Sequence, residues 1–263
     1  MTQPHEMTHL QRWEEYLDPH TGVLRNLRGV TDPQTWKQEE TDLVAIRAVD
    51  LPEFGFGHDT VADELRAIHE HLFQDCYEWA GQYRDVDMMK NHPQIPDSEV
   101  AFTPWQNIPD QLDAIQERID SIEWDDLLLS EKKDALAEIH AKLNYVHPFR
   151  EGNGRATRSF MEELARSHDV TITWEGSNDA LIFASSASMM HESGLALAPW
   201  TALYSEIAEQ ATWQDETLDG IDALLNMMGP INLDYAAQKG ADNSKAPPGP
   251  QTSMINHWHS YEF

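Results

Sequence analysis

The chain reads His147-Pro148-Phe149-Arg150-Glu151-Gly152-Asn153-Gly154-Arg155-Ala156-Thr157-Arg158 between two segments of helical periodicity. This short stretch combines an imidazole, a carboxylate, two glycines and three guanidinium groups. A base beside groups that bind phosphate is typical of an enzyme that activates a nucleophile against a nucleotide. The stretch therefore decides both the expected fold and the expected function.

The proline and the glycines predict a tight turn between two helices. Pro148 disfavours helical backbone at His147, so the preceding helix should end there and its imidazole should leave the helix surface. Gly152 and Gly154 allow the backbone to turn several N–H groups to one side. Because this turn would open the next helix, its free N–H groups and positive dipole end should bind phosphate.

The polar side chains of the stretch fit a nucleotide site. Asn153 could donate an amide hydrogen bond to a phosphate oxygen. Glu151 would repel an anion unless a divalent cation lay between them, so we interpret it as a Mg²⁺ ligand shared with the phosphates. Arg155 and Arg158 are three residues apart and could hold the outer phosphates bidentately. His147 could take the proton of an attacking hydroxyl.

The acidity of the whole chain sets this cationic stretch apart. The sequence has 46 Asp and Glu against 18 Lys and Arg, a formal net charge of -28. Such a field repels ATP unless cations gather locally, and Arg150, Arg155 and Arg158 lie within one short segment. The same acidity argues against a nucleic-acid backbone as the main partner, since that binding depends on basic patches.

Each residue of the stretch also has a purely structural interpretation. Arginines in the first turns of a helix often pair with nearby carboxylates, and Glu151 could pair with Arg150 or Arg155. A histidine at a helix end is often a C-terminal cap, and glycines can simply end a helix. None of these alternatives explains why all the features occur together, so we favour the nucleotide site.

Helical periodicity dominates the rest of the chain and predicts a mainly α fold. Apolar residues recur at intervals of three and four along several segments. The segments expected to be helical are 59–77, 110–122, 130–146, 155 onward, 178–191 and 200–213. Ser130 is expected to be the N-cap of its helix. Residues 82–104 lack helical phase and contain prolines, which predicts a short irregular β-hairpin.

Composition limits the class of protein further. The sequence has no apolar run of membrane-spanning length and no signal-peptide pattern, which predicts a cytoplasmic protein without a membrane partner. The single cysteine, Cys76, excludes an intrachain disulfide and should be a buried packing residue. Neither the P-loop nor the Rossmann fingerprint is present. The 263 residues suffice for one large domain, or for one domain with tails.

The stretch matches the Fic-domain signature, His-x-Phe-x-Asp/Glu-Gly-Asn-Gly-Arg-x-x-Arg, at every specified position. A second block, Tyr77-Glu78-Trp79-Ala80-Gly81-Gln82-Tyr83-Arg84 followed by Lys90, resembles the region that leads into the Fic target-binding flap. The resemblance covers about residues 40–210 and implies a Fic-fold helical bundle with a short β-hairpin flap. The expected divisions are an N-terminal extension (1–39), the Fic domain (40–213), a C-terminal helical extension (214–237) and a disordered tail (238–263).

The resemblance implies a protein adenylyltransferase, which transfers AMP from ATP to a Ser, Thr or Tyr hydroxyl of a target protein and releases pyrophosphate. By position, His147 would be the general base, Glu151 the Mg²⁺ ligand and Phe149 the anchor of the loop. The implied nucleotide-binding residues are Lys90, Asn91, Arg150, Gly152, Asn153, Gly154, Arg155 and Arg158. The target protein would dock on the flap by adding a strand to it.

The resemblance also bears on regulation. Many Fic enzymes are restrained by a Ser/Thr-x-x-x-Glu-Gly/Asn helix whose glutamate pairs with the second motif arginine, here Arg158. The one formal match, residues 171–176, is rich in β-branched residues and is expected to be an extended loop. The chain therefore resembles the class that is inhibited by a separate small antitoxin, of which it would be the toxin half.

Two other functions stay open at this point. A protein resembling the Doc toxin would transfer phosphate instead of AMP, but in that branch a lysine commonly stands where this chain has Gly154. A catalytically inactive Fic module would only bind its partner, although the intact His147, Glu151 and Asn153 argue for catalysis. The sequence specifies neither the target protein nor the oligomeric state.

Overall fold

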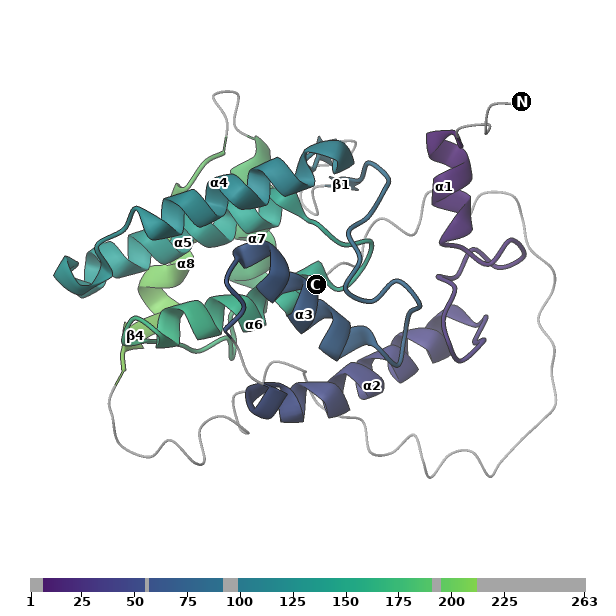
Figure 1. Cartoon of the computed structure of the whole chain (residues 1–263), viewed down its shortest axis with the longest axis horizontal. Helices are drawn as coiled ribbons and strands as arrows, with labels where there is room; N and C mark the ends of the chain where they lie inside the picture. The colour runs from purple at the N-terminus through teal and green to yellow at the C-terminus, as the bar shows by residue number, and fades with distance from the viewer. Residues whose placement is uncertain (1–6, 55–56, 92–98, 191–194, 212–263) are drawn as a thin grey trace.

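A computed structural model describes residues 7–54, 57–91, 99–190 and 195–211, which form a helical bundle (Figure 1). The α-helices are α1 (His9–Glu15), α2 (Pro33–Phe54), α3 (Val61–Phe73), α4 (Ile108–Asp120), α5 (Leu129–Val146), α6 (Asn153–Arg166), α7 (Asn178–Ala187) and α8 (Ala198–Ile207). The strands are β1 (Met89–Asn91), β2 (Glu99–Ala101), β3 (Val170–Ile172) and β4 (Ala208–Gln210). They form two small antiparallel sheets, β1–β2 and β3–β4. The expected mainly α fold is confirmed.

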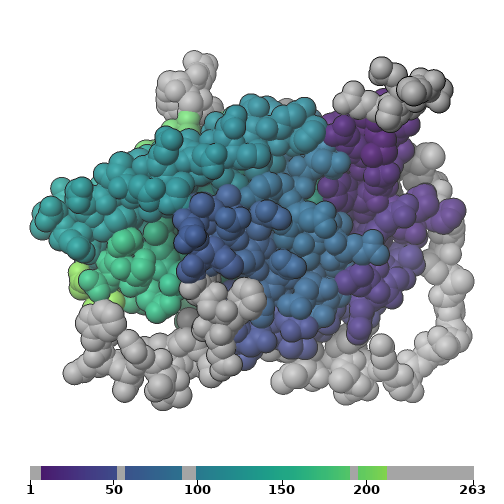
Figure 2. Space-filling view, in the orientation of Figure 1, coloured from purple at the N-terminus to yellow at the C-terminus, as the bar shows by residue number. Residues whose placement is uncertain are grey.

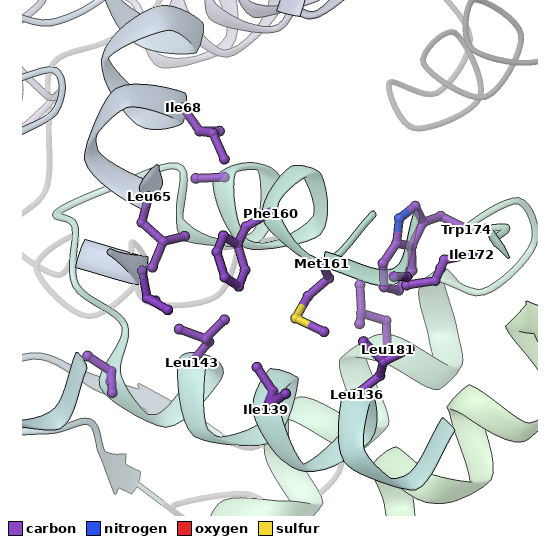
Figure 3. Close-up of a cluster of buried hydrophobic side chains, with 14 of the residues drawn as sticks. Leu65, Ile68, Leu136, Ile139, Leu143, Phe160, Met161, Ile172, Trp174 and Leu181 are labelled. Carbon is purple, nitrogen blue, oxygen red and sulfur yellow. The ribbon is translucent and has the colours of Figure 1, made fainter. Parts of the chain in front are cut away.

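Helix α6 lies at the centre of the core, packed against both α3 and α5. Figure 3 shows Phe160 of α6 directed toward Leu65 of α3 and Leu143 of α5, with Met161 directed toward Ile139. All five side chains are buried. Burying one such side chain contributes about 1.5–3 kcal/mol, so the helix that follows the signature loop is held firmly in place.

The start of α5 differs from the expectation. The helix begins at Leu129, so Ser130 lies inside it and is not its N-cap. The backbone N–H of Leu128 instead donates to Oε2 of Glu131 at 2.8 Å. A carboxylate in the first turn therefore binds the N–H group at the helix start. The prediction that Ser130 is the N-cap was wrong.

The expected hairpin is confirmed as the pair β1–β2. Met89 pairs with Ala101 and Lys90 with Val100 in antiparallel register. We call residues 86–103 the flap, of which the structure describes the two stems, 86–91 and 99–103. The stems bring the end of the hairpin back to the region where α5 ends, because the N–H of Thr103 donates to the carbonyl of Tyr145 at 3.0 Å.

Helix α2 was not expected from the sequence. It packs against α3 along the lower edge of Figure 1. Its inward face buries Val44 and Leu51, but its outward face exposes Ile46 (67%) and Val49 (46%). Apolar residues on both faces remove the amphipathic signal on which the prediction depends. The helix also runs through residues 39 and 40, where the boundary of the Fic domain was expected.

The C-terminal part shows a second difference. The helix expected over 200–213 ends at Ile207, because Ala208–Gln210 pairs as β4 with β3. The extended backbone expected at 171–176 is confirmed for its first two residues, which belong to β3; this strand ends at Ile172. The C-terminal helical extension (214–237) and the tail (238–263) lie outside the described residues.

Cys76 is buried and forms no disulfide, as expected. Burial raises the pKa of its thiol to about 12, with a further contribution from Glu40. The thiol is therefore protonated at neutral pH and acts as an apolar packing group. Among the helices that the structure describes, none combines the length and the apolar character that a bilayer crossing requires.

Two fully buried histidines indicate how stability should depend on pH. Burial lowers the pKa of His69 and of His140 to about 3. Between pH of about 6.5 and 3 the unfolded chain takes up protons that the folded chain excludes. We expect this contribution to stability to be complete above pH of about 6.5 and to be lost as pH falls, by at most about 1.4 kcal/mol per unit for each histidine.

Urea unfolding at several pH values between about 7.5 and 5 would measure this slope. The matched variant is His140→Asn, whose amide can still meet the Tyr204 hydroxyl that lies 2.9 Å from Nδ1 of His140. The variant should show a shallower loss of stability toward acid than the unmodified chain. An equal slope in both proteins would show that His140 does not titrate on unfolding in this range.

Candidate active site

His147 occupies the C-cap of α5 in a left-handed conformation, with φ 47° and ψ 62°. The helix ends at Val146, so the expected break before Pro148 is confirmed. The N–H of His147 still donates to the carbonyl of Leu143 at 3.0 Å. A left-handed backbone costs a residue with a side chain about 1–2 kcal/mol. The surrounding contacts must therefore hold this conformation.

The imidazole of His147 lies against the flap. Its ring stacks on the ring of Phe102 with centroids 3.8 Å apart and planes 12° from parallel. His147 is 7% exposed and Phe102 is 4% exposed. The candidate base is therefore enclosed between the end of α5 and the second stem of the flap, with little freedom to rotate.

The loop between α5 and α6 is closed by Asn153. Its Oδ1 accepts from the N–H of Phe149 at 2.8 Å, and its Nδ2 donates to the carbonyl of Phe149 at 2.8 Å. The ring of Phe149 is fully buried and stacks on His69 at 3.9 Å. Asn153 thus shapes the loop, and because Nδ2 carries a second N–H, its expected hydrogen bond to a phosphate stays a prediction.

The N-terminus of α6 has the arrangement of an anion site. Gly152 is the N-cap with φ 81°. The N–H of Ala156 donates to the carbonyl of Gly152 at 3.1 Å, which leaves the N–H groups of the first turn without a carbonyl partner in the helix. Those of Asn153, Gly154 and Arg155 belong to this turn. The partial positive charge of the helix end adds to their attraction for an anion.

Arg155 is bound to carboxylates and does not extend freely toward this helix end. Its Nη2 contacts Oε1 of Glu40 on α2 and lies 3.2 Å from Oε1 of Glu151. Oε2 of Glu40 also accepts from the hydroxyl of Tyr77 at 2.5 Å. The structural alternative, in which Glu151 pairs with Arg155, therefore holds here. The expected contact of Arg155 with the outer phosphates stays a prediction.

Arg158 differs from Arg155. It is 6% exposed, and within the described part of the chain no carboxylate lies in ion-pair distance of its guanidinium. Burial, together with the nearby Arg155, lowers its pKa to about 10, so it remains cationic at neutral pH. A Cβ built on Gly154 would lie 3.7 Å from its Nη1. A buried cation thus faces the first turn of α6.

Glu162 lies one turn further along α6. Burial raises its pKa to about 7, against the lowering effect of Arg158. A carboxyl group with this pKa is partly protonated near neutral pH and neutralises Arg158 only incompletely.

Arg150 packs against the N-terminal segment. Its guanidinium lies 4.1 Å from the ring centroid of Trp13 and 5.8 Å from that of Tyr16. Figure 2 shows this segment in purple, packed against one end of the molecule. A cation on an aromatic ring stabilises by about 0.5–2 kcal/mol. Arg150 thus attaches α1, and its predicted contact with the nucleotide stays a prediction.

The two predicted flap residues lie on β1. Nζ of Lys90 donates to Oγ of Ser185 at 2.7 Å, and this hydroxyl donates to Oδ1 of Asn144 at 2.6 Å. Lys90 therefore connects the flap to α7 and α5. Asn91 pairs with Glu99 through the backbone, and its side chain lies outside the described residues.

Glu151 is held from three sides. Its Oε1 accepts from the N–H of Gly152 at 3.0 Å and faces Arg155 at 3.2 Å. Its carbonyl lies 2.9 Å from Nε2 of His69. Nδ1 of His69 accepts from the N–H of Gly81 at 2.9 Å, which makes Nε2 the protonated nitrogen that donates to Glu151. The carboxylate therefore has a fixed place next to the start of α6.

A cation at this place would depend on the substrate. In the portion of the chain that the structure describes, no three or more His, Cys, Asp or Glu residues gather as a metal site. One carboxylate completed by phosphate oxygens and water is nevertheless a common way in which proteins bind Mg²⁺. The donor set of Glu151 with a bound triphosphate therefore fits that ion.

Two contributors to the site were missed in the sequence. His69 could have been suspected, because it is a polar residue next to the apolar stripe of α3. Glu40 could not have been found, because its helix had no periodic signal. Both act on Glu151, His69 directly and Glu40 through Arg155.

Residues 59–165 match the model of the Fic/DOC family. The protein adenylyltransferase VbhT of Bartonella schoenbuchensis is 32% identical over 162 residues, which are 62% of this chain and 33% of VbhT. A probable protein adenylyltransferase Fic of Salmonella typhimurium is 31% identical over 166 residues, which are 62% of this chain and 78% of that protein. The chain thus spans a third of the length of VbhT and over three quarters of the Salmonella protein.

Solved structures share the arrangement of helices. BepC, an effector of Bartonella tribocorum with bound AMPPNP, superposes with a TM-score of 0.67 at 25% identity and covers 76% of this chain and 98% of its own. The N-terminal Fic domain of a Bartonella quintana effector with bound ADP has a TM-score of 0.66 at 26% identity, over 76% of this chain and 96% of its own. Both were solved with an adenine nucleotide.

Proposed function

The chain belongs to the Fic/DOC family, and we propose that it is a protein adenylyltransferase that transfers AMP from ATP to a hydroxyl side chain of a target protein. The observation that carries this proposal is the pairing of a base with an anion site. His147 ends α5, and the first turn of α6 begins within the same short loop. The relatives named protein adenylyltransferases support the same reaction.

The triphosphate of ATP would bind at the beginning of α6. The N–H groups of Asn153, Gly154 and Arg155, which have no carbonyl partner in the helix, would surround the inner phosphates, as free N–H groups at a helix start do for other anions. Arg158, buried and cationic, would bind the outer phosphates. Arg155 would keep Glu151 in place from its position between two carboxylates.

Mg²⁺ would bind between Glu151 and the phosphates. When bound, it would neutralise the charge of the leaving pyrophosphate. Glu151 keeps its orientation because His69 holds its carbonyl and Arg155 holds its carboxylate. A carboxylate that is fixed before the ion arrives loses less conformational entropy on binding.

In the transfer step, the hydroxyl oxygen of the target attacks the α-phosphorus of ATP. The bond from that phosphorus to the oxygen bridging to the β-phosphorus breaks, and pyrophosphate leaves. His147 accepts the proton of the hydroxyl. This role requires the imidazole to face the target side chain, and the stacking of the imidazole on Phe102 limits its rotation, which supports such a role.

The target would dock on the flap. Within the described residues β1 pairs only with β2, so an extended segment of the target could add as a further strand. Backbone hydrogen bonds would place the hydroxyl side chain through the register of the target strand on β1, whatever the sequence of the target. Because ATP is the donor, the reaction is proposed to take place in the cytoplasm.

The decisive experiment uses ATP that carries the label on its α-phosphate. The full chain, Mg²⁺ and a whole-cell lysate are incubated, and labelled proteins are analysed by mass spectrometry. Modification of a Ser, Thr or Tyr by AMP, absent with His147→Ala, would support the proposal. A parallel reaction uses ATP labelled on its γ-phosphate. Transfer of that label alone would instead identify a Doc-like phosphotransferase, and no transfer of either label would favour a binding module.

Arg158 is the arginine whose loss should weaken nucleotide binding most. We expect Arg158→Gln to weaken the affinity for an ATP analogue about 10–100-fold, the equivalent of one or two charged hydrogen bonds. Calorimetric titration would measure the change. Arg166→Gln at the other end of α6, where the arginine pairs with Glu163, is the matched control. Equal affinities in the two variants would contradict the role of Arg158.

We also propose that a separate small protein restrains this enzyme. The formal match to the inhibitory pattern lies in β3 and the loop after it, with Trp174 only 7% exposed. Its residues thus form a strand and core contact and not an inhibitory helix. A carboxylate of a small helical partner could instead pair with Arg158. Co-purification of such a partner, lost in Arg158→Gln, would support this; a partner whose binding ignores Arg158 would not.

A further inference from the structure

Arg84 is a fully buried arginine that lies between the flap and the end of α5. It is 1% exposed. Its Nε donates to the carbonyl of His147 at 2.8 Å, and its Nη1 donates to that of Val86 at 2.6 Å. Its Nη2 donates to the carbonyls of Thr103 at 2.5 Å and Val146 at 3.1 Å. The guanidinium therefore contacts backbone of three segments at once.

The four carbonyl groups that accept from Arg84 come from the end of α5 and from both stems of the flap. Two carbonyls belong to the C-terminal end of α5, where the helix dipole favours a cation. The other two belong to the two stems of the flap, Val86 before β1 and Thr103 after β2. In addition, the N–H of Arg84 donates to the carbonyl of Pro148 at 2.9 Å. One side chain thus joins both stems of the flap to the candidate base.

Phe102 joins the same parts by a second contact. It follows β2 directly, and its N–H donates to the carbonyl of Met88 across the flap at 3.1 Å. Its ring stacks on the imidazole of His147. Phe102 therefore both links the two stems of the flap and sets the plane of the His147 imidazole.

We propose that Arg84 and Phe102 are positioning residues that fix the base relative to the target-docking flap; this inference rests on the proposed function. Arg84 sets where the backbone of His147 lies with respect to both stems. Phe102 sets how its imidazole is rotated. A target strand docked on the flap and the imidazole of His147 would then be held in fixed positions relative to each other.

The geometry explains why a lysine would not replace Arg84. Its planar guanidinium donates in several fixed directions, and the three segments lie along those directions. A lysine has one ammonium on a flexible stem, and a fully buried ammonium at this place would leave carbonyls without a donor. A displacement of about 1 Å at a reacting group can lower a rate by about 10²-fold.

The test compares two variants with two matched controls in the full chain. Arg84→Lys and Phe102→Leu change the proposed positioning residues. Arg118→Lys changes an arginine that pairs with Glu138 on α5, and Phe183→Leu changes a phenylalanine that is 47% exposed on α7. Each protein is assayed for transfer of labelled AMP to a lysate protein, for affinity to a fluorescent ATP analogue and for melting temperature.

We expect AMP transfer to fall about 10–100-fold in Arg84→Lys and about 10-fold in Phe102→Leu. Nucleotide affinity should stay within about 2-fold of the unmodified chain, since neither residue lies at the start of α6. Both controls should transfer at the unmodified rate. If Arg84→Lys fails to fold, Phe102→Leu decides alone.

A spectroscopic signal separates positioning from general stability. The ring protons of His147, assigned by their absence in His147→Ala, should shift in Phe102→Leu because the stacked ring is removed. An unshifted imidazole signal, or transfer at the unmodified rate by the folded variants, would overturn the inference. Failure of the proposed function looks different, because the unmodified chain would then label no protein at all.

Discussion

We expect His147→Ala to lower the rate of AMP transfer about 10²–10⁴-fold, the range that a general base contributes. The variant should still bind ATP, because the phosphates are proposed to bind at α6 and Arg158 and not at the imidazole. The alanine also removes the ring stacked on Phe102, so the melting temperature must be measured alongside the rate. A folded variant that binds ATP and transfers no AMP is the expected outcome.

The rate should be measured with labelled ATP under conditions in which the enzyme is limiting, and the affinity by titration with an ATP analogue. His20→Ala, at an exposed histidine in the N-terminal segment, is the matched control and should transfer at the unmodified rate. If His147→Ala also transferred normally, another group would have to accept the proton and the base would have been wrongly assigned.

Gly152→Ala should have the second large effect, on the stability of the fold. Gly152 has φ 81°, and a Cβ there would lie 2.9 Å from one ring carbon of Phe73 and closer still to two others. Phe73 is fully buried and cannot move away. The left-handed backbone costs alanine about 1–2 kcal/mol and the overlap about 1–3 kcal/mol more.

A melting temperature lower by on the order of 10 °C would correspond to that loss in a domain of this size. The control is Gly154→Ala, where the nearest neighbour of a new Cβ is Nη1 of Arg158 at 3.7 Å, an ordinary contact. Gly154→Ala should melt near the unmodified protein. Equal melting temperatures for the two variants would show that the loop around Gly152 rearranges easily.

Local patterns account for what could be predicted. The helices of the core, α3, α4, α5 and α6, follow from apolar spacing, and the break at Pro148 follows from the chemistry of proline. The hairpin was expected from missing helical phase and from prolines. These signals depend on residues close together in the sequence, so they were available without the structure.

Long-range contacts account for what was missed. The sequence placed Arg150, Arg155 and Arg158 together, but their partners come from elsewhere. Trp13 binds Arg150 and Glu40 binds Arg155, and neither partner lies near the signature loop in sequence. Only packing decides which arginine is left for a ligand. The same holds for Arg84, whose acceptors are backbone carbonyls that carry no sequence signal.

The three arginines of the signature loop therefore have separate tasks. Arg150 attaches the N-terminal helix, Arg155 holds the carboxylate of Glu151, and Arg158 faces the start of α6. If the chain binds a triphosphate as proposed, this division leaves Arg158 and the start of α6 as its main cationic contacts. In a chain of net charge -28, the proposed triphosphate binding requires such a local concentration of positive charge.

The most direct test of the central claim is a crystal structure of the full chain with Mg²⁺ and an ATP analogue that cannot be cleaved. We expect the inner phosphates at the first turn of α6, the outermost phosphate at Arg158 and the α-phosphorus on the side of His147. A nucleotide bound elsewhere, with the first turn of α6 left without phosphate, would contradict the account.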